Sequence, residues 1–234
     1  MNTFDQSAAL NPAAKDPASK KNANKDNPFL NEAIPFSPTA GQRTYACFKR
    51  FVDIVISLLA LLILLLPALI VIIAIRVESK GSPIFKQIRY GRNGRHFTIY
   101  KFRTMYENAP HAVATEDFED AGVHITKIGH LLRKTSIDEL PQLVNVLIGD
   151  MSLIGPRPLI VEEERIHLFR LANHIYDLRP GMTGNAQVNG RDDITFEDKM
   201  RRDLEYLHNV SFLMDLKIFF KTLTVVFRRE GVKY

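Results

Sequence analysis

The chain has 234 residues, 46% hydrophobic and 24% charged, and its 31 Lys and Arg against 26 Asp and Glu give a net charge of +5. This length allows one domain of moderate size with its own core. With only 12 glycines, one cysteine and no sustained heptads, collagen-like, coiled-coil and disulfide-stapled classes are excluded. The basic excess favours anionic partners such as lipid head groups or nucleotides, and the lone Cys47 indicates a reducing compartment.

Residues 1–44 are predicted to form a disordered tail. They are rich in Asn, Ala, Lys, Pro and Ser, and five prolines between Pro12 and Pro38 prevent a long helix. They also lack the apolar residues needed to build a core. No secretory signal is expected, because this segment contains no apolar stretch of the kind such signals require.

Residues 45–80 are predicted to meet a membrane, because residues 54–75 carry no charge. As a straight helix this run would measure about 33 Å, enough to cross a hydrocarbon core of about 30 Å. The run therefore argues against a fully soluble protein. Pro67 lies two-thirds of the way along it, where a missing backbone donor kinks a helix.

Both flanks of this run are basic, with Lys49 and Arg50 before it and Arg76 and Lys80 after it. The positive-inside rule would hold both ends on the cytoplasmic face. A re-entrant hairpin satisfies both flanks, whereas a spanning helix satisfies only one. The residues by themselves leave both alternatives open.

Residues 81–234 are predicted to form an α+β domain, mostly helical with a small β-hairpin. The hairpin is expected from two β-rich arms, 82–90 and 95–104, around a glycine-containing turn. Apolar spacing predicts helices at 125–134, 141–148, 159–173 and 195–229, the last broken near Asn209. Residues 179–193, with three glycines, are expected to be irregular and functional. From Phe212 onward apolar residues alternate with lysines, so this helix lies in the membrane interface or packs against the core.

Asp138 and Glu139 are the main candidates for chemistry. Either Ser136 and Glu139 form a capping box that puts Asp138 in a first helical turn, or Pro141 is the first helical residue and both carboxylates precede it. In both cases the helix N-terminus favours negative charge and can bind phosphate. One carboxylate could act as nucleophile and the other hold Mg²⁺. Taken alone, such a pair is more often a helix cap.

Basic residues accompany this pair. Arg157 lies between two prolines, in a stiff segment suited to bidentate phosphate binding. Arg133 precedes Asp138 by five residues, and Lys101 and Arg103 end the hairpin. Acidic and basic side chains close to a membrane segment together predict a site for a phosphorylated substrate at the bilayer surface.

Several motifs, in order along the chain, resemble those of the bacterial sugar transferases, the monotopic phosphoglycosyl transferases. The motifs are QIRYG (87–91), YKFRTM (100–105), RKTSIDELPQ (133–142), MSLIGPRP (151–158), RPGMTG (179–184) and QVNGR (187–191). The match runs from about residue 49 to residue 229 and is most similar to the small, PglC-like members. The resemblance implies a monotopic membrane protein with interfacial amphipathic helices, and it favours the re-entrant hairpin over the spanning helix.

This resemblance implies transfer of a sugar-1-phosphate from a UDP-sugar to a polyprenyl phosphate, usually undecaprenyl phosphate, with release of UMP. Asp138 matches the nucleophile that forms a phosphosugar-aspartyl intermediate, and Glu139 matches the residue associated with Mg²⁺. The positions that match substrate-binding motifs are Arg133, Arg157, Lys101, Arg103, Gln187, Arg191 and Asp203. For Asp203 the alternative is an ordinary surface acid on a helix.

The resemblance also implies a place and partners. It puts the catalytic domain on the cytoplasmic face of the bacterial inner membrane, against an anionic bilayer, at the first membrane step of polysaccharide or glycoprotein assembly. A second copy of the chain and downstream glycosyltransferases are candidate partners. Nucleic acid is not expected, because no recognised binding module is present.

Two positions depart from the family pattern. Leu66 precedes Pro67 where the family often has Ser, so no hydroxyl there can satisfy the freed backbone carbonyls, and Asn185 stands where Trp is usual. Two other functions fit the same residues: a membrane-anchored, non-enzymatic scaffold and an Mg²⁺-dependent phosphohydrolase. The sequence identifies neither the sugar nor the glycoconjugate pathway.

Overall fold

The computed structural model describes residues 35–109, 124–161, 163–190 and 195–228. Most of the predicted tail, residues 1–34, lies outside this part of the chain. Residues 40–44, which were assigned to the tail, are helical, because Thr39 starts a helix there. Its hydroxyl accepts from the backbone N–H of Gln42, and the Gln42 side chain accepts from the N–H of Thr39.

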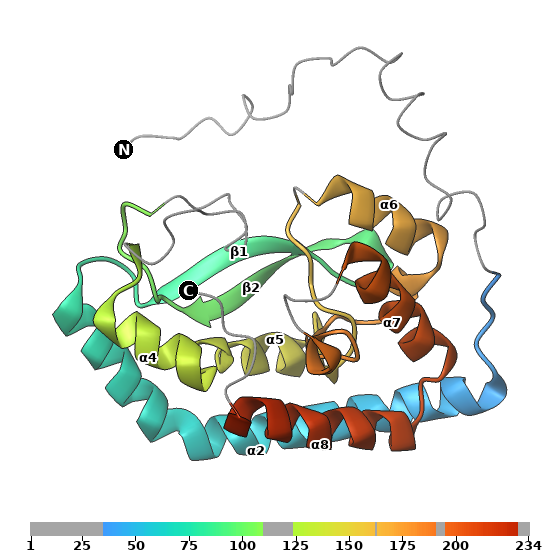
Figure 1. Cartoon of the computed structure of the whole chain (residues 1–234). Coiled ribbons are helices and arrows are strands. Elements are labelled where there is room, and N and C mark those ends of the chain that lie inside the picture. The colour runs from blue at the N-terminus through green and yellow to red at the C-terminus, as the bar shows by residue number, and fades with distance from the viewer. Residues whose placement is uncertain (1–34, 110–123, 162, 191–194, 229–234) are drawn as a thin grey trace, which may run out of the picture. The chain divides into compact units, whose positions relative to one another are not determined.

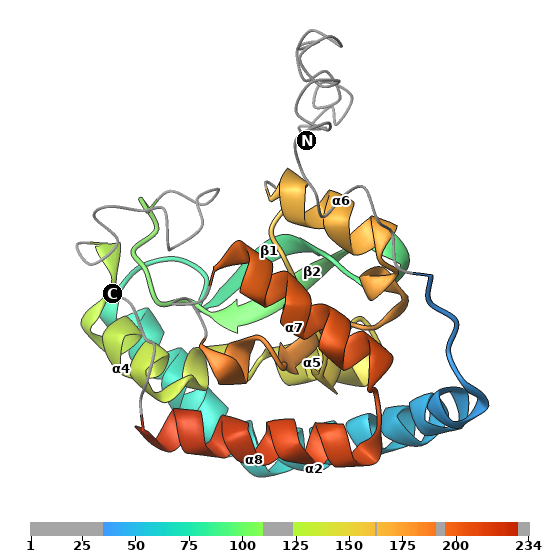
Figure 2. The same cartoon turned by 45° about the vertical axis from the view of Figure 1, so that its right-hand side comes forward.

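The membrane run lies within one long helix, α2 (Ala40–Glu78), which continues through Pro67. The structure thus has one continuous helix here, and the expected re-entrant hairpin is not confirmed by it. The helix bends instead: its first part runs beside α8, and its second part turns away toward α4 and β1 (Figures 1 and 2). A proline removes one backbone donor, and a bend can absorb that loss without ending the helix.

The predicted hairpin is confirmed as the antiparallel pair β1 (Ile84–Tyr90) and β2 (His96–Phe102). The turn contains a short 3₁₀ segment, η2 (Arg92–Gly94), in which Asn93 and Gly94 take positive φ angles. A second sheet was not predicted. It pairs β3 (Ser152–Ile154) with β4 (Gly181–Thr183) in parallel. Because a Cβ on Gly181 would lie 2.1 Å from the backbone nitrogen of Gly155, these two motifs need glycine to approach each other.

The helical domain follows the predicted order. It contains α4 (Lys127–Thr135), α5 (Gln142–Ile148), α6 (Glu164–Ala172), α7 (Phe196–His208) and α8 (Phe212–Arg228). Single 3₁₀ turns intervene as η4 (Ile137–Glu139), η5 (Ile175–Asp177) and η6 (Gln187–Asn189). The predicted break near Asn209 is confirmed. Helix α6 begins five residues later than expected, since the chain before it forms an extended segment bonded to Arg89 and Tyr90.

Clusters of buried residues join these elements, and three of them are described here. One contains Ile75, Phe102 and Leu132, and packs the end of α2 against β2 and α4. Another joins Ile99 of β2 to Val146 and Met151 beside α5. The third joins Ile154 of β3 to Tyr206 and Ile218 on α7 and α8. The catalytic-domain elements therefore pack on α2 itself, so the membrane run forms part of the domain.

Polar contacts also fasten the first part of α2 to the domain. The buried carboxylate of Asp215 on α8 accepts hydrogen bonds from Tyr45 at 2.7 Å, from Lys49 at 2.6 Å and from Tyr206 at 2.7 Å. Arg50 donates to the carbonyls of Val146 and Leu147 at the end of α5. Lys49 and Arg50, which form the basic flank before the apolar run, are thus engaged within the protein.

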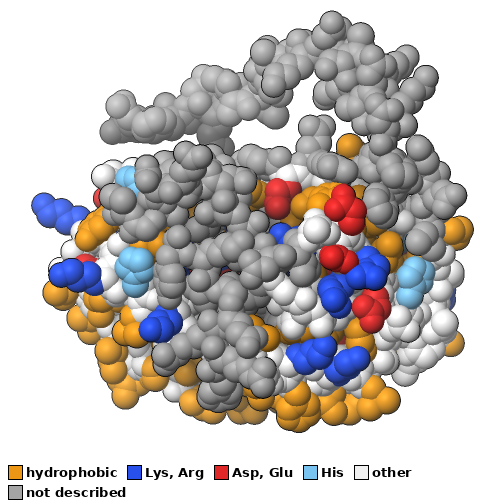
Figure 3. Space-filling model, viewed as in Figure 1, with side chains coloured by type: hydrophobic (Ala, Val, Ile, Leu, Met, Phe, Trp, Pro, Cys, Tyr) orange, Lys and Arg blue, Asp and Glu red, His pale blue; other side chains and the backbone are white. Residues whose placement is uncertain are grey.

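One edge of the molecule is strongly apolar. Figure 3 shows hydrophobic side chains gathered along the edge where Figure 1 places α2 and α8. Among the large exposed hydrophobics there are Leu62, Ile63, Leu65 and Leu66 on α2, and Leu213 on α8. Within the described residues, α2 alone is long and apolar enough to cross a membrane. This edge is suited to contact with lipid.

Candidate active site

Asp138 and Glu139 lie on the single turn η4, between α4 and α5. The expected capping box is not formed. Ser136 ends α4 in the left-handed conformation, with φ of 56°, and its side chain makes no capping bond to the following turn. Pro141 stands at the N-cap of α5, so both carboxylates come just before that helix, close to the second alternative. The abrupt change of direction at Ser136 turns this pair toward the hairpin.

Asp138 has an unusual electrostatic environment. Burial raises its pKa to about 6, and the negative charge of Glu139 adds to the rise, whereas Lys101 and Arg133 oppose it. A carboxyl group with such a pKa is largely ionised at neutral pH while remaining poorly hydrated. Such a carboxylate is suited to act as a nucleophile.

Glu139 is paired with Lys101 from the end of β2. Lys101 donates from Nζ to Oε1 of Glu139 at 2.7 Å, and both side chains are half-buried. Because the same ammonium also lowers the pKa of Asp138, one lysine serves both carboxylates. One strand, β2, and the turn η4, whose paired residues are 38 positions apart in the sequence, thus meet at this ion pair.

Arg133 and Arg103 both line the site but differ in their contacts. Arg133 donates from Nε to Oγ1 of Thr104 at 2.9 Å, and burial lowers its pKa, partly offset by the charge of Asp138. Arg103 donates to the carbonyls of Ser79 and Lys80, at 2.8 and 2.6 Å. Arg103, predicted to bind substrate, therefore holds the C-terminal end of α2 to the hairpin.

Arg157 is carried by an extended segment, residues 155–160, which we call the Arg157 strap. Its side chain is exposed while its neighbours Pro156 and Pro158 are buried. Arg89 donates to the carbonyl of Pro158 at 3.2 Å, and Arg170 donates to the carbonyl of Arg157 at 2.7 Å. The strap is thus fixed through its backbone, and the exposed Arg157 side chain takes no part in either of these two bonds.

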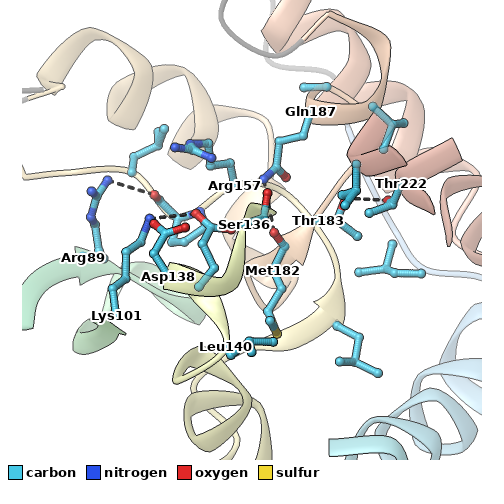
Figure 4. Close-up of a pocket in the computed structure, with 18 of the residues that line it drawn as sticks. Arg89, Lys101, Ser136, Asp138, Leu140, Arg157, Met182, Thr183, Gln187 and Thr222 are labelled. Atoms are coloured by element: carbon cyan, nitrogen blue, oxygen red, sulfur yellow. Dashed lines mark hydrogen bonds and ion pairs between the residues drawn. The ribbon is translucent and has the colours of Figure 1, made fainter. Parts of the chain in front are cut away.

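These side chains share one open cavity of about 1390 Å³. In Figure 4, Lys101 and Asp138 lie on one side of it, Thr183 and Thr222 on the other, with Leu140 and Met182 between them. The predicted site residues that line it are Lys101, Arg103, Arg133, Asp138, Glu139, Arg157, Gln187 and Asp203. Arg191 lies outside the described residues. The structure thus brings together every predicted site residue that it describes.

Asp203 is a buried acid, not the surface acid of the alternative interpretation. It is 2% exposed and accepts from Nη2 of Arg170 at 2.6 Å. Burial raises its pKa, while Arg170 opposes that rise. Its carboxylate therefore belongs to the wall of the cavity and is engaged with Arg170.

The loop after β4 closes another side of the cavity. Gln187 donates from Nε2 to the carbonyl of Met182 at 3.3 Å, while its buried Oε1 has no partner among the described residues. Asn185, where an aromatic residue was expected, is buried and donates to the carbonyl of Arg202 and to Glu205. Polar contacts thus hold Asn185 to α7, at the position where the family pattern usually has Trp.

Sequence reasoning missed Arg170 and Thr222 as parts of this site. Arg170 lies in the last turn of α6, where it looks like an ordinary helical surface residue. Thr222 shares a hydrogen bond of 2.8 Å with Thr183 across the cavity wall. Arg89, which holds the strap, was visible as part of the motif at residues 87–91. Arg170 and Thr222 offered no local sequence signal, because the residues they bond to, Asp203 and Thr183, lie far away in the sequence.

The sequence of this chain is similar to those of known proteins. The family model described as "Bacterial sugar transferase" matches residues 44–229. A UDP-galactose-lipid carrier transferase of Erwinia amylovora is 41% identical over 197 residues, 78% of this chain and 41% of the relative. An uncharacterized sugar transferase, EpsL, of Bacillus subtilis is 41% identical over 192 residues, 79% of this chain and 90% of the relative.

A UDP-glucose:undecaprenyl-phosphate glucose-1-phosphate transferase of Klebsiella pneumoniae is 41% identical over 187 residues, 75% of this chain and 39% of the relative. The chain thus spans less than half the length of the Erwinia and Klebsiella relatives, and most of the length of EpsL. The matched region contains every candidate residue described above. This chain belongs to the bacterial sugar transferase family.

Proposed function

We propose that this protein transfers a sugar-1-phosphate from a UDP-sugar to a polyprenyl phosphate, with undecaprenyl phosphate as the acceptor. The observation that carries the proposal is the carboxylate of Asp138, whose pKa is raised to about 6, in one cavity with Lys101, Arg133 and Arg157. Phosphoryl transfer requires positioning of the reactants and neutralisation of phosphate charge. A nucleophile among three cations supplies both.

The reaction proceeds in two displacements at one phosphorus atom. A carboxylate oxygen of Asp138 forms a bond to the phosphorus that bears the sugar, and the bond from that phosphorus to the UMP oxygen breaks, so UMP leaves. An oxygen of the acceptor phosphate then attacks the same phosphorus, and the bond to Asp138 breaks. The carboxylate is regenerated and the product is a polyprenyl-diphosphate-sugar.

The basic residues have separate tasks in this scheme. Lys101 stands beside both carboxylates, and the exposed guanidinium of Arg157 is placed for bidentate binding of the diphosphate. Arg133, half-buried beside Asp138, stabilises the charge that develops on the transferred phosphoryl group. These cations favour the ionised form of the nucleophile and hold the anionic substrate against it.

Mg²⁺ is the proposed cofactor, with Glu139 as its main protein ligand. The donor set fits: two adjacent carboxylates face the cavity, and Glu139 already binds a cation, the ammonium of Lys101. Mg²⁺ commonly takes one or two carboxylates and completes its coordination with substrate phosphates and water. The described residues contain no group of three or more His, Cys, Asp or Glu side chains suited to a dedicated metal site. When bound, the ion would supply neutralisation of the diphosphate.

The bent α2 helix is proposed to be re-entrant, with both ends on the cytoplasmic face of the bacterial inner membrane. Its bend, its basic flanks and its packing on the domain at both ends support this arrangement. Helix α8 would then lie in the interface beside the first part of α2, against anionic lipids. The cavity would open close to the height of a lipid phosphate.

The proposal is tested by measuring UMP release from a panel of UDP-sugars with Mg²⁺ and undecaprenyl phosphate. With at least one UDP-sugar, the wild type should release UMP over many turnovers. This should happen only when undecaprenyl phosphate is supplied in excess over the protein. Asp138→Asn should abolish release, while Asp177→Asn, a control at an exposed acid outside the cavity, should retain it. Lipid binding without nucleotide consumption would support the scaffold instead, and release of free phosphate without acceptor would support a phosphohydrolase.

A further inference from the structure

The cavity continues well beyond the charged groups. Its volume of about 1390 Å³ exceeds the roughly 300–1000 Å³ of ordinary small-molecule sites. Beyond Asp138 its walls become apolar, and these walls are formed by Leu140, Met182, Phe219, Leu223 and Val226, which we call the apolar arm. The cavity thus has a charged end and an apolar end that meet at η4.

Helix α8 forms one wall of the apolar arm. Phe219 and Leu223 line it while remaining 47% and 39% exposed, so this wall extends from the cavity to the surface of α8. The same helix runs beside α2 along the apolar edge of the molecule (Figures 1 and 2). Through Phe219 and Leu223, the apolar wall of the cavity is therefore continuous with the lipid-facing side of α8.

The polar groups in the walls of the apolar arm are satisfied. Thr183 and Thr222 share a hydrogen bond of 2.8 Å, and the Thr222 hydroxyl also donates to the carbonyl of Ile218 at 2.8 Å. These hydroxyls therefore bond to each other and to the backbone. An apolar chain lying there would leave neither hydroxyl without a partner.

We infer that the apolar arm is the binding site for the isoprenoid chain of the polyprenyl phosphate acceptor, with its phosphate at the Asp138 end. The inference rests on the proposed function and adds to it the path by which the lipid substrate enters. A UDP-sugar has no long apolar part that could pack against these walls, whereas the acceptor consists of one phosphate and a long hydrocarbon chain. The cations at the charged end match that phosphate.

Adjacent residues on α8 offer a matched pair for the test. Phe219 lines the apolar arm, whereas Phe220 does not, and the two side chains are exposed to a similar degree, 47% and 57%. A general weakening of membrane association would affect Phe219→Ser and Phe220→Ser alike. Leu223→Ser is a second variant of the arm, should Phe219→Ser fold poorly.

The kinetic experiment uses the full-length protein in vesicles. Phe219→Ser should raise the KM for undecaprenyl phosphate by about tenfold, equivalent to about 1.4 kcal/mol of lost apolar contact. It should leave the exchange of labelled UMP into UDP-sugar, which needs no acceptor, unchanged. Phe220→Ser should change neither quantity. Equal effects of the two variants on the acceptor KM, or a slower exchange with Phe219→Ser, would overturn the inference.

A photo-crosslinking experiment separates this inference from the proposed reaction. A polyprenyl phosphate that carries a benzophenone near its phosphate should label peptides of α8 and of β4 around Met182, and excess undecaprenyl phosphate should prevent the labelling. Labelling there without UMP release would uphold the apolar arm and contradict the proposed function. UMP release with labelling confined to α2 would uphold the function and overturn the apolar arm.

Discussion

The guanidinium of Arg170 on α6 donates from Nη2 to Oδ2 of Asp203 on α7 at 2.6 Å and from Nη1 to the carbonyl of Arg157 at 2.7 Å. Both side chains of the ion pair are almost fully buried, at 4% and 2% exposure. The pair therefore connects α7 to the Arg157 strap. We therefore expect Asp203 to act on the site through Arg170, as a positioning residue.

This geometry predicts separate effects on stability and on substrate binding. Arg170→Met leaves the Asp203 carboxylate buried without its partner, so the free energy of unfolding should fall by about 3–5 kcal/mol. The double variant Arg170→Met with Asp203→Leu removes both charges and should recover most of that stability. It should still show a raised KM for the UDP-sugar, because the strap has lost its bond to α6. Recovery of both stability and KM in the double variant would show that the pair has no positioning role.

The environment of Asp138 predicts the pH dependence of the first displacement. The nucleophile must be ionised, so the rate of UMP exchange should rise from pH 5 to pH 7 with an apparent pKa of about 6. Lys101 lowers the pKa of Asp138, so Lys101→Met should shift the profile to higher pH. The residual exchange rate of this variant, measured from pH 5 to pH 9, provides the test. An unshifted profile would mean that another group controls the rate.

The raised pKa of Asp138 also affects stability. Between the unfolded value near 3.8 and the folded value of about 6, the native state binds the extra proton, so stability falls as pH rises through this window. Asp138→Asn removes the buried charge and should raise the free energy of unfolding by about 1–2 kcal/mol at pH 8, the side chain being partly exposed. Thermal unfolding of both proteins at pH 4 and pH 8 measures the difference, which should be smaller at pH 4. Destabilisation at pH 8 would contradict this account of the site.

The bend of α2 predicts the accessibility of its two ends. In a Cys47→Ser background, Ala40→Cys and Ser82→Cys place single thiols just inside the start of α2 and beyond its end. Both should be protected from a membrane-impermeant thiol reagent in intact cells and should react after lysis. Labelling of the first position alone in intact cells would indicate a spanning helix.

The sequence predicted the elements whose signals are local. The hairpin followed from β-rich arms around a turn, and the break between α7 and α8 from the polar residues near Asn209. The sheet of β3 and β4 was missed because three-residue strands are too short to show a period of two. The start of α6 was set too early, because the bonds from Arg89 and Tyr90 hold residues 158 and 159 in an extended conformation.

For the site, the sequence identified the residues better than their arrangement. Asp138, Glu139 and Arg157 were found from their motifs and lie in one cavity. The capping box failed because Ser136 adopts a left-handed conformation at the end of α4, which depends on how α4 packs. The contact between Arg170 and Asp203 joins positions 33 residues apart, and no local pattern marks such a pair.

The most direct test of the central claim is the mass of the intact protein after incubation with an accepted UDP-sugar and Mg²⁺ in the absence of lipid acceptor. The account predicts a gain of one sugar-phosphate, located on the peptide that contains Asp138 and lost when undecaprenyl phosphate is added. Asp138→Asn should show no gain. A wild type that releases UMP with acceptor but never gains this mass, or an Asp138→Asn variant that still gains it, would contradict the assignment of Asp138 as the nucleophile.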